Sequence, residues 1–369
     1  MLYDLIVPSA FGLEAVTARE LNRLGYEQTR TEDGRVYFRG NESDVARANL
    51  WLRTGARVQI CLSRFRAVTF EELYQGVRAI PWGDLLPEDA RFPMDGRSVK
   101  STLFSISDCQ AIAKKAVVDK MSEKYGRSFF EETGALYRLE VSLLKDNVTV
   151  TLDTTGAGLH KRGYRKIAGE APLKETMAAA LVTLSTYRGR EDFCDPFCGS
   201  GTIPIEAALI AKNRAPGIAR SFSAMAWHGF ERPVWERARE EARSREFSGN
   251  YRIFASDIDP HAIELAKENA RRAGVDDVVQ FAVADALRFD RKTEKGIIVT
   301  NPPYGERIME KKEAETLYAG FGRAWQATEN WKLYLLSSHT EFERTFGQTA
   351  DKKRKLYNGM IKCDLFMYL

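Results

Sequence analysis

The alternation of short apolar runs with helix-length segments is the feature that most constrains the fold of this 369-residue chain. Five apolar runs in the C-terminal half have the composition of buried strands, and they lie at 193–195, 252–256, 279–282, 297–300 and 333–337. Longer segments separate them, and 366–369 is a candidate for a last strand. This pattern is typical of an open, mostly parallel α/β sheet, which binds its ligands at the carboxyl ends of its strands.

The first 156 residues predict two smaller α+β units ahead of this sheet. Residues 1–62 predict a βαββαβ-type unit, with strand patterns at 3–7, 36–40 and 57–62 and helical patterns at 13–24 and 42–52. Residues 63–156 predict a second unit, in which helical patterns precede a hairpin of strands. The Gly/Thr-rich stretch 154–158 is interpreted as the linker into a third domain at 157–369.

The charge balance permits nucleic-acid binding without requiring it. Lys and Arg number 55 against 51 Asp and Glu, which gives a formal net charge of +4. Basic residues concentrate at 160–166 and 352–355, and a tyrosine lies within or close to each run. Both runs have two interpretations, a solvated loop or a contact with an RNA backbone, and we slightly favour the second.

The cysteines and histidines do not predict a metal site. The five cysteines show no Cys-x-x-Cys spacing, and the four histidines form no cluster. The N-terminus lacks the basic segment of a secretory signal, and no apolar stretch is long enough to span a bilayer. We therefore expect a soluble, metal-free protein of the reducing cytoplasm.

A glycine-rich loop follows the first apolar run of the predicted sheet. That run ends at Asp195, and Gly199, Gly201 and Thr202 lie between it and a helical segment. Glycines at a strand-to-helix turn let the backbone approach a nucleoside cofactor. The loop lacks the Lys-Ser/Thr pair of a P-loop, and Pro204 replaces the third glycine of a dinucleotide fingerprint. A cofactor other than a nucleoside triphosphate or a dinucleotide is therefore expected.

Two further strand candidates end in a carboxylate. Asp257 follows the run at 252–256, in the position where such folds bind ribose hydroxyls. Asp285 follows the next run, where it suits an adenine amino group. Each aspartate alone is equally well explained as a helix N-cap. Their order along the chain, together with the glycine loop, favours a cofactor site.

The fourth apolar run leads directly into Asn301-Pro302-Pro303-Tyr304. The side-chain oxygen of Asn301 and the carbonyl of Pro302 are two acceptors for the two N–H groups of an exocyclic amine on a flipped base. The prolines stiffen the loop, and Tyr304 offers a stacking surface. The alternative is an ordinary proline-rich turn. Cys198 lies inside the glycine loop and is interpreted as structural rather than as a nucleophile.

These residues resemble the class I, S-adenosylmethionine-dependent amino-methyltransferases. The longer string Thr-Asn-Pro-Pro-Tyr-Gly-Glu-Arg at 300–307 resembles the THUMP-domain methyltransferases that make N2-methylguanine in 23S ribosomal RNA. The resemblance covers nearly the whole chain. It implies a ferredoxin-like segment, a THUMP RNA-binding module over about 63–156, and a Rossmann-like methyltransferase domain with a long insertion at 213–227 after the glycine loop.

The resemblance also implies S-adenosylmethionine as cofactor and RNA as partner. In this scheme the loop residues hold the methionine end of the cofactor, Asp257 its ribose and Asp285 its adenine. The implied cofactor residues are Asp195, Gly199, Gly201, Thr202, Asp257 and Asp285, and the implied target-base residues are Asn301, Pro302 and Tyr304.

Three alternatives remain open at this stage. A tRNA guanine-N2 methyltransferase would have the same architecture, and a DNA adenine-N6 methylase would use the same tetrapeptide, because both amines present two N–H donors. The THUMP-like unit favours RNA over DNA. A non-catalytic RNA-binding protein is the third alternative, and the intact Asn301, Asp257 and Asp285 argue against it.

Overall fold

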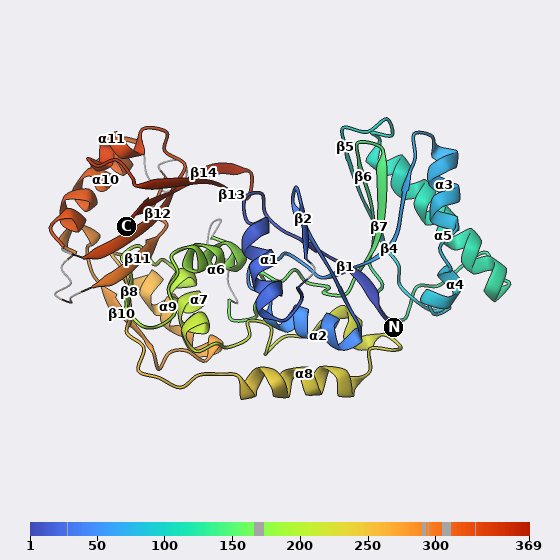
Figure 1. Cartoon of the computed structure of the whole chain (residues 1–369), viewed down its shortest axis with the longest axis horizontal. Helices are drawn as coiled ribbons and strands as arrows, with labels where there is room; N and C mark the ends of the chain where they lie inside the picture. The colour runs from blue at the N-terminus through green and yellow to red at the C-terminus, as the bar shows by residue number, and fades with distance from the viewer. Residues whose placement is uncertain (28, 166–172, 290–292, 294, 305–310, 329) are drawn as a thin grey trace.

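The computed structural model describes residues 1–27, 29–165, 173–289, 293, 295–304, 311–328 and 330–369. The strands of this part of the chain form two seven-stranded sheets. Figure 1 shows the C-terminal sheet with its helices at one end of the molecule, the second N-terminal unit at the other end, and the first unit between them.

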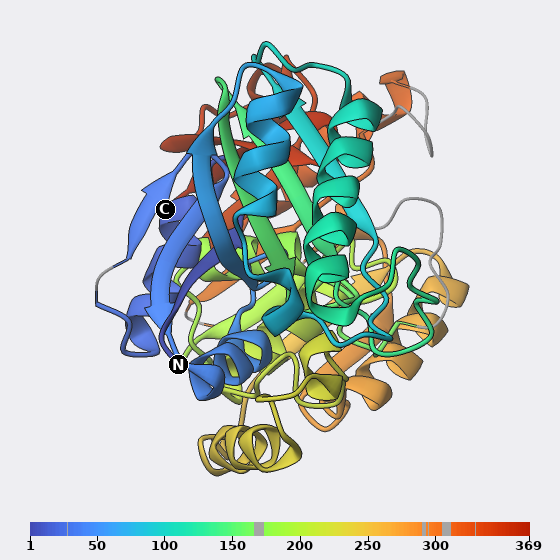
Figure 2. The ribbon, with the colours of Figure 1, turned by 90° about the vertical axis from the view of Figure 1, so that its right-hand side faces the viewer.

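The N-terminal sheet is built by both of the smaller units. Its order is β2-β3-β1-β4-β7-β6-β5, with bounds β1 (Tyr3–Pro8), β2 (Arg30–Glu32), β3 (Arg35–Gly40), β4 (Gln59–Arg66), β5 (Met94–Val99), β6 (Leu139–Leu144) and β7 (Asn147–Asp153). Its helices are α1 (Glu14–Arg23), α2 (Glu42–Trp51), α3 (Phe70–Arg78), α4 (Trp82–Leu85) and α5 (Ile106–Tyr125). Figure 2 shows α3 and α5 side by side over the strands of the second unit.

Strand β4 joins the two units into one sheet. It pairs with β1 at only two positions, Leu5 with Ile60 and Ile6 with Gln59. It pairs with β7 along its whole length, with a register shift between Cys61 and Ser63. The boundary expected between residues 62 and 63 therefore lies inside a shared strand.

The C-terminal sheet has the open, mostly parallel arrangement that the apolar runs predict. Its order is β10-β9-β8-β11-β12-β14-β13, with bounds β8 (Asp192–Asp195), β9 (Ile253–Asp257), β10 (Val279–Val283), β11 (Gly296–Thr300), β12 (Trp331–Ser337), β13 (Lys352–Asn358) and β14 (Ile361–Tyr368). Within the group β8 to β12, neighbouring strands are parallel. Strand β14 pairs antiparallel with both β12 and β13.

Helices cover both faces of the C-terminal sheet. Its elements are α6 (Glu175–Leu184), α7 (Thr202–Ala211), α9 (Pro260–Ala273), η2 (Ala286–Arg288), α10 (Lys311–Gln326) and α11 (Phe342–Phe346). One apolar cluster contains residues of α6, α7 and α9, and another contains residues of α10 and α11. Helix α7 follows β8, and α9 follows β9. These two strands end in the predicted site residues Asp195 and Asp257.

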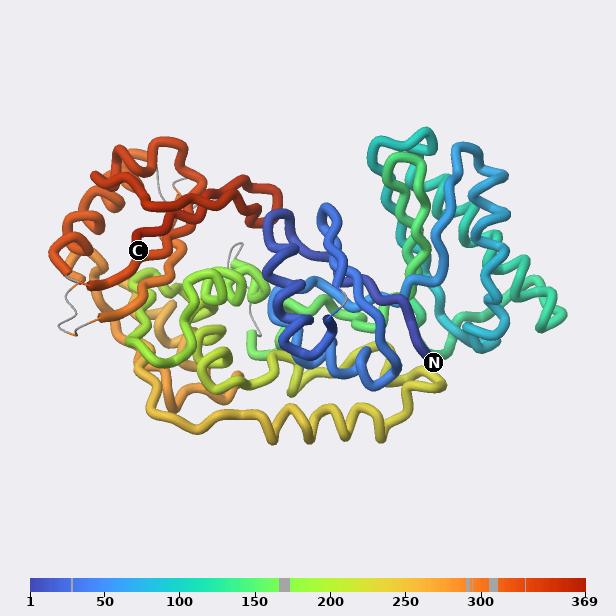
Figure 3. Tube along the Cα trace, in the orientation of Figure 1, coloured from blue at the N-terminus to red at the C-terminus, as the bar shows by residue number. Residues whose placement is uncertain are grey.

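The insertion after α7 belongs to the N-terminal core rather than to the domain that contains it. It carries η1 (Ser223–Ala226) and α8 (Arg232–Ser244). Its buried residues Phe222, Trp227 and Trp235 join the same apolar cluster as the residues of both N-terminal units. Figure 3 shows the chain leaving the C-terminal domain, running along the N-terminal half as α8, and returning. The insertion therefore fastens the two halves together.

The stretch at 154–158, interpreted as a linker, is anchored by its first two residues. The side chains of Thr154 and Thr155 are fully buried. Asn49 of α2 donates to the Thr154 hydroxyl at 2.9 Å and accepts from the Thr155 hydroxyl at 2.6 Å. These hydroxyls satisfy a buried amide instead of facing water, and the interpretation of 154–158 as the connection into the third domain stays a prediction.

Two arginines of the basic run at 160–166, Arg162 and Arg165, are engaged within the protein, whereas Lys161 is exposed. An RNA contact of this run stays a prediction. The Arg162 side chain is 2% exposed and pairs with the fully buried Glu206 of α7 at 3.3 Å. It also donates to the carbonyl of Leu159 at 2.6 Å and to that of Arg53. Tyr164 donates to the same Glu206 at 3.2 Å. Arg162 therefore connects the helix after the glycine loop to the N-terminal unit.

The second basic run lies in a strand. Residues 352–355 begin β13, the edge strand of the C-terminal sheet. Lysines on an edge strand discourage pairing with another chain, which is a sufficient reason for this composition. A contact of this run with RNA stays a prediction.

Candidate active site

The structure brings the predicted site residues to four adjacent strand ends. In the order β10-β9-β8-β11, Asp285 follows β10, Asp257 ends β9, Asp195 ends β8 and Asn301 follows β11. Because these strands are parallel, their carboxyl ends meet at one edge of the sheet. The hydroxyl of Thr300, the last residue of β11, donates to Asp195 Oδ1 at 2.7 Å and fixes the two central ends to each other.

The glycine loop needs glycine at both predicted positions. Gly199 has φ +50° and Gly201 has φ +82°, in the left-handed region that favours glycine. A Cβ on Gly201 would lie 3.0 Å from Ala266 of α9, whereas a Cβ on Gly199 would point into open space. The loop therefore presents bare backbone beside an open volume, as a nucleoside cofactor requires.

Asp195 is a buried carboxyl group with one oxygen unused. Its Oδ1 accepts from Thr300 and from the backbone N–H of Phe197 at 3.1 Å. Its Oδ2 is buried and has no hydrogen-bond partner. Burial, opposed in part by these bonds, raises the pKa of Asp195 to about 7. A buried acceptor without a partner is costly, so Oδ2 is suited to a cationic or donor group of a ligand.

Asp257 and Asp285 both accept hydrogen bonds from backbone N–H groups. Asp257 Oδ1 accepts from the N–H of Asp259 at 3.0 Å, and its Oδ2 accepts from the N–H of Gly199 at 2.9 Å. Asp285 accepts from the N–H of Leu287 at 2.9 Å and caps η2. A carboxylate has about four acceptor positions, so these bonds leave room for ribose or amine donors. Their roles toward a cofactor stay predictions.

Thr202, the first residue of α7, is turned toward the basic run. Its hydroxyl accepts from Arg165, which also lies 3.7 Å from Glu175 of α6. This hydroxyl is therefore engaged on the side of the loop that faces α6, and contact of Thr202 with a cofactor stays a prediction.

The Asn301-Pro302-Pro303-Tyr304 loop is held by bonds at both of its ends. The Tyr304 hydroxyl donates to Asn301 Oδ1 and lies 3.8 Å from the Sγ of Cys363 in β14. Pro302 is buried. The Pro303 carbonyl accepts from the Tyr318 hydroxyl of α10 at 2.6 Å. The Tyr304 ring packs against the apolar cluster that contains residues of α6, α7 and α9. Stacking of this ring on a base therefore stays a prediction.

The sequence patterns did not indicate two further residues near this edge of the sheet. Ile258, directly after Asp257, exposes 71% of its surface, and an apolar side chain beside a ribose site suits the face of an adenine ring. Its position after the strand-end aspartate was the available signal. Tyr318 positions the Pro303 carbonyl, but it lies in a later helix with no local motif. The Gly305, Glu306 and Arg307 extension lies outside the described residues.

Other chemistry at this edge is limited. Cys198 is buried, and burial raises the pKa of its thiol, which disfavours a thiolate nucleophile. Within the described residues, no group of three or more His, Cys, Asp and Glu side chains is arranged to hold a metal ion. In the same part of the chain, the helices are too short or too polar to cross a bilayer.

Three family models match the chain in the order of its units. Residues 4–59 match the RlmL ferredoxin-like domain, residues 67–153 match the THUMP domain, and residues 162–366 match the RMKL-like methyltransferase domain. The chain belongs to the RMKL-like methyltransferase family. The ferredoxin-like, THUMP and Rossmann-like methyltransferase architecture expected from the resemblance is thereby confirmed.

Two curated relatives extend over the whole chain. The "Putative RNA methyltransferase YpsC" of Bacillus subtilis (strain 168) is 47% identical over 99% of this chain and 96% of its own length. The "Ribosomal RNA large subunit methyltransferase K/L" of Psychromonas ingrahamii is 35% identical over 100% of this chain, which spans 50% of that protein. The larger relative thus carries a further region of similar length.

Solved structures of similar chains have the same fold. A "predicted N6-adenine-specific DNA methylase" from Listeria monocytogenes is 49% identical, with a TM-score of 0.95 over 100% of this chain and 96% of that one. SMU.472, "a putative methyltransferase complexed with SAH", is 41% identical, with a TM-score of 0.93 over 100% and 98%. The expectation of an S-adenosylmethionine-dependent RNA methyltransferase is confirmed at the level of the family.

Proposed function

We propose that this enzyme transfers a methyl group from S-adenosylmethionine to the exocyclic N2 amine of a guanine in 23S ribosomal RNA. The single observation that supports this best is the placement of the Asn301-Pro302 acceptors on the strand end that Thr300 bonds to Asp195. Acceptors for an amine and a buried carboxyl for the cofactor thus belong to neighbouring strands. An RNA substrate implies that the enzyme acts in the cytoplasm.

The residues at the sheet edge fit the proposed cofactor. Asp195 Oδ2 would accept from the methionine ammonium, and the bare backbone at Gly199 and Gly201 would pack against the methionine end. Asp257 would bind the ribose hydroxyls, and Asp285 with Ile258 would contact the adenine. When bound, S-adenosylmethionine supplies an electrophilic methyl group on a sulfonium.

Asn301 and Pro302 would orient the target amine. The Tyr304 hydroxyl uses one lone pair of Asn301 Oδ1, and the second remains for one N–H of the amine. The Pro302 carbonyl would accept the other N–H, so the nitrogen lone pair points away from both acceptors and toward the methyl donor. An amide cannot act as a base, so the proton would pass to solvent after methyl transfer. Positioning and electrostatics would supply most of the catalysis.

The choice of substrate rests on the whole chain rather than on the pocket. Guanine N2 and adenine N6 present the same pair of donors to Asn301 and Pro302. The THUMP domain supports RNA over DNA, and the relative named for large-subunit ribosomal RNA supports 23S rRNA over tRNA. The name of the Listeria homologue keeps an adenine-N6 DNA methylase as the second candidate.

The product decides among these candidates. Purified protein would be incubated with tritiated S-adenosylmethionine and one nucleic acid in each of three separate reactions. The nucleic acids are unmodified 23S rRNA transcript, unmodified tRNA and duplex DNA. Nucleoside digestion and chromatography should place the label in N2-methylguanosine of the 23S transcript. Label in N6-methyladenosine, or label only with DNA, would overturn the substrate while leaving the cofactor site intact.

A further inference from the structure

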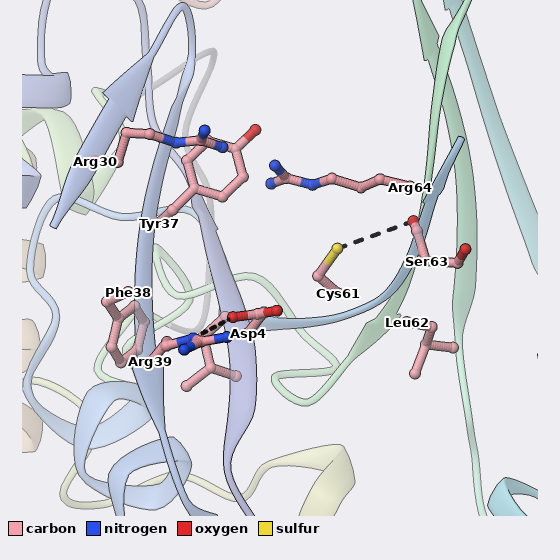
Figure 4. Close-up of a pocket in the computed structure, with 10 residues that line it drawn as sticks. Asp4, Arg30, Tyr37, Phe38, Arg39, Cys61, Leu62, Ser63 and Arg64 are labelled. Carbon is pink, nitrogen blue, oxygen red and sulfur yellow. Dashed lines mark hydrogen bonds and ion pairs between the residues drawn. The ribbon is translucent and has the colours of Figure 1, made fainter. Parts of the chain in front are cut away.

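A cavity lies where the N-terminal sheet divides into its two units. β1 leaves β4 after the Leu5–Ile60 pair, while β4 continues along β7 through its irregularity at Cys61 and Ser63. The space between the diverging strands is a cavity of about 390 Å³ (Figure 4). Cavities of about 300 to 1,000 Å³ are typical of small-ligand sites, so this one suits a single nucleotide rather than a duplex.

Arginines dominate the charge of this cavity. Alternate residues of a strand share a face, so Arg35, Tyr37 and Arg39 lie on one face of β3, while the intervening Val36 and Phe38 are buried. The lining residues include three arginines, Arg30, Arg39 and Arg64, and one carboxylate, that of Asp4, while Glu32 lies beside the lining and accepts from the Tyr37 hydroxyl at 2.7 Å. The wall is therefore positive and favours an anion.

Tyr37 organises two of these arginines. The guanidinium carbons of Arg30 and Arg64 lie 4.6 and 4.2 Å from its ring centroid, from β2 and β4 respectively. Figure 4 shows Arg64 extended across the opening toward the ring. A guanidinium held over an aromatic ring keeps its N–H edges free for a planar, bidentate contact. The ring thus holds Arg64 in place before any ligand arrives, whereas Arg30 also pairs with Glu32.

The three arginines differ in how much of their charge is neutralised. Arg39 pairs with Asp4 at 2.7 Å, and Arg30 pairs with Glu32 at 3.0 Å. Arg64 has no carboxylate within ion-pair distance in the described part of the chain. Its charge is held in place by the ring and has no protein counter-ion.

We propose that this cavity binds one nucleotide of the RNA substrate through its phosphate, with Arg64 as the principal phosphate ligand and Arg30 as the second. The proposal rests on the proposed function, in that RNA is the substrate. It gives the junction of the ferredoxin-like and THUMP domains a definite contact with the RNA backbone, separate from the methyl-transfer site.

Arg64→Ala tests the proposal by RNA binding. The affinity for unmodified 23S rRNA transcript, measured by filter binding in about 0.1 M salt, should fall about fivefold to tenfold. The slope of log affinity against log salt should decrease in magnitude by about 1, which corresponds to one lost phosphate contact. The affinity for S-adenosylmethionine should not change, because the site lies in the other sheet. Arg232→Ala, which removes an exposed arginine of α8, is the matched control and should bind as wild type does.

Cys61 offers a second measurement that needs no variant in the cavity. It lines the cavity and is only partly buried, whereas the other four cysteines are buried. Saturating 23S transcript should slow alkylation of Cys61 in the wild-type protein. The proposed RNA site in this cavity is overturned if the wild-type protein binds RNA, Arg64→Ala binds it equally tightly, and Cys61 is not protected. That result leaves the proposed function standing. Absence of both RNA binding and RNA methylation in the wild type would overturn both.

Discussion

The two sheets of this enzyme carry their proposed functional side chains in different ways. In the C-terminal sheet, Asp195, Asp257, Asp285 and Asn301 lie at or directly after strand ends, so each follows an apolar run in the sequence. In the N-terminal sheet, the cavity arginines project from strand faces and meet only because β2, β3, β1 and β4 follow one another in the sheet and β1 diverges from β4. A strand-end site can be recognised from local sequence, whereas a strand-face site depends on register and pairing.

The largest effect should come from the strand-end site. Asn301→Ala removes one of the two amine acceptors and should lower turnover by on the order of 100-fold or more, with the affinity for S-adenosylmethionine unchanged. Single-turnover methylation and calorimetry measure the two quantities. Tyr304→Phe, which keeps the ring and loses the bond to Asn301 and the contact with Cys363, should cause a smaller loss. Full turnover in Asn301→Ala would exclude the amine-acceptor mechanism.

The connection between the sheets should affect folding rather than chemistry. Arg162→Ala leaves Glu206 buried without its ion-pair partner and should lower the free energy of unfolding by about 3 to 5 kcal/mol. Denaturant unfolding measures this. Arg232→Ala breaks an exposed pair with Glu236 in α8 and should cause no measurable change. Equal stability of the two variants would show that the buried pair does not hold the halves together.

A smaller effect separates ligand binding from helix capping at the end of β9. Asp257→Ala should weaken S-adenosylmethionine binding by about 1 to 3 kcal/mol, the usual cost of leaving a donor without its charged acceptor. Asp259→Ala removes the N-cap of α9, whose side chain accepts from His261, and should reduce stability with little change in affinity. If Asp257→Ala binds as tightly as wild type, Asp257 only holds the backbone of Asp259 and Gly199.

The smallest effect concerns pH. Burial raises the pKa of Asp195 to about 7, so the carboxylate forms as pH rises through neutrality. Pairing of that carboxylate with the methionine ammonium should therefore make S-adenosylmethionine bind about tenfold more tightly at pH 8 than at pH 6. Asp195→Asn should remove this dependence. An unchanged pH profile in that variant would place the ammonium elsewhere.

The same group should make the stability of the free protein depend on pH with a defined sign. The folded protein keeps the Asp195 proton up to about pH 7, whereas the unfolded chain releases it near the ordinary aspartate pKa of 3.8. Between these values the folded state binds more protons. The contribution of Asp195 to stability therefore falls as pH rises from about 4 to 7, and bound cofactor should offset that loss.

Two basic runs show where composition alone misleads. The described residues of the run at 160–166 include Arg162, which is buried against Glu206, while the run at 352–355 lies on an edge strand. Both runs show the same feature in the sequence, a high density of basic residues. Which of their side chains meets water depends on whether a buried carboxylate lies opposite, as Glu206 does for Arg162, and no local pattern records that.

The sequence by itself determined the parallel sheet, the glycine loop and the order of the residues proposed to bind the cofactor and the amine. These features follow from short-range physics, since apolar runs form buried strands and a left-handed loop requires glycine at Gly199 and Gly201. Only the tertiary structure decided that β4 serves two units, that the α8 insertion packs into the N-terminal core, and that Arg64 reaches Tyr37. Each of these depends on contacts between residues far apart in the chain, whose geometry is set by packing rather than by neighbouring residues.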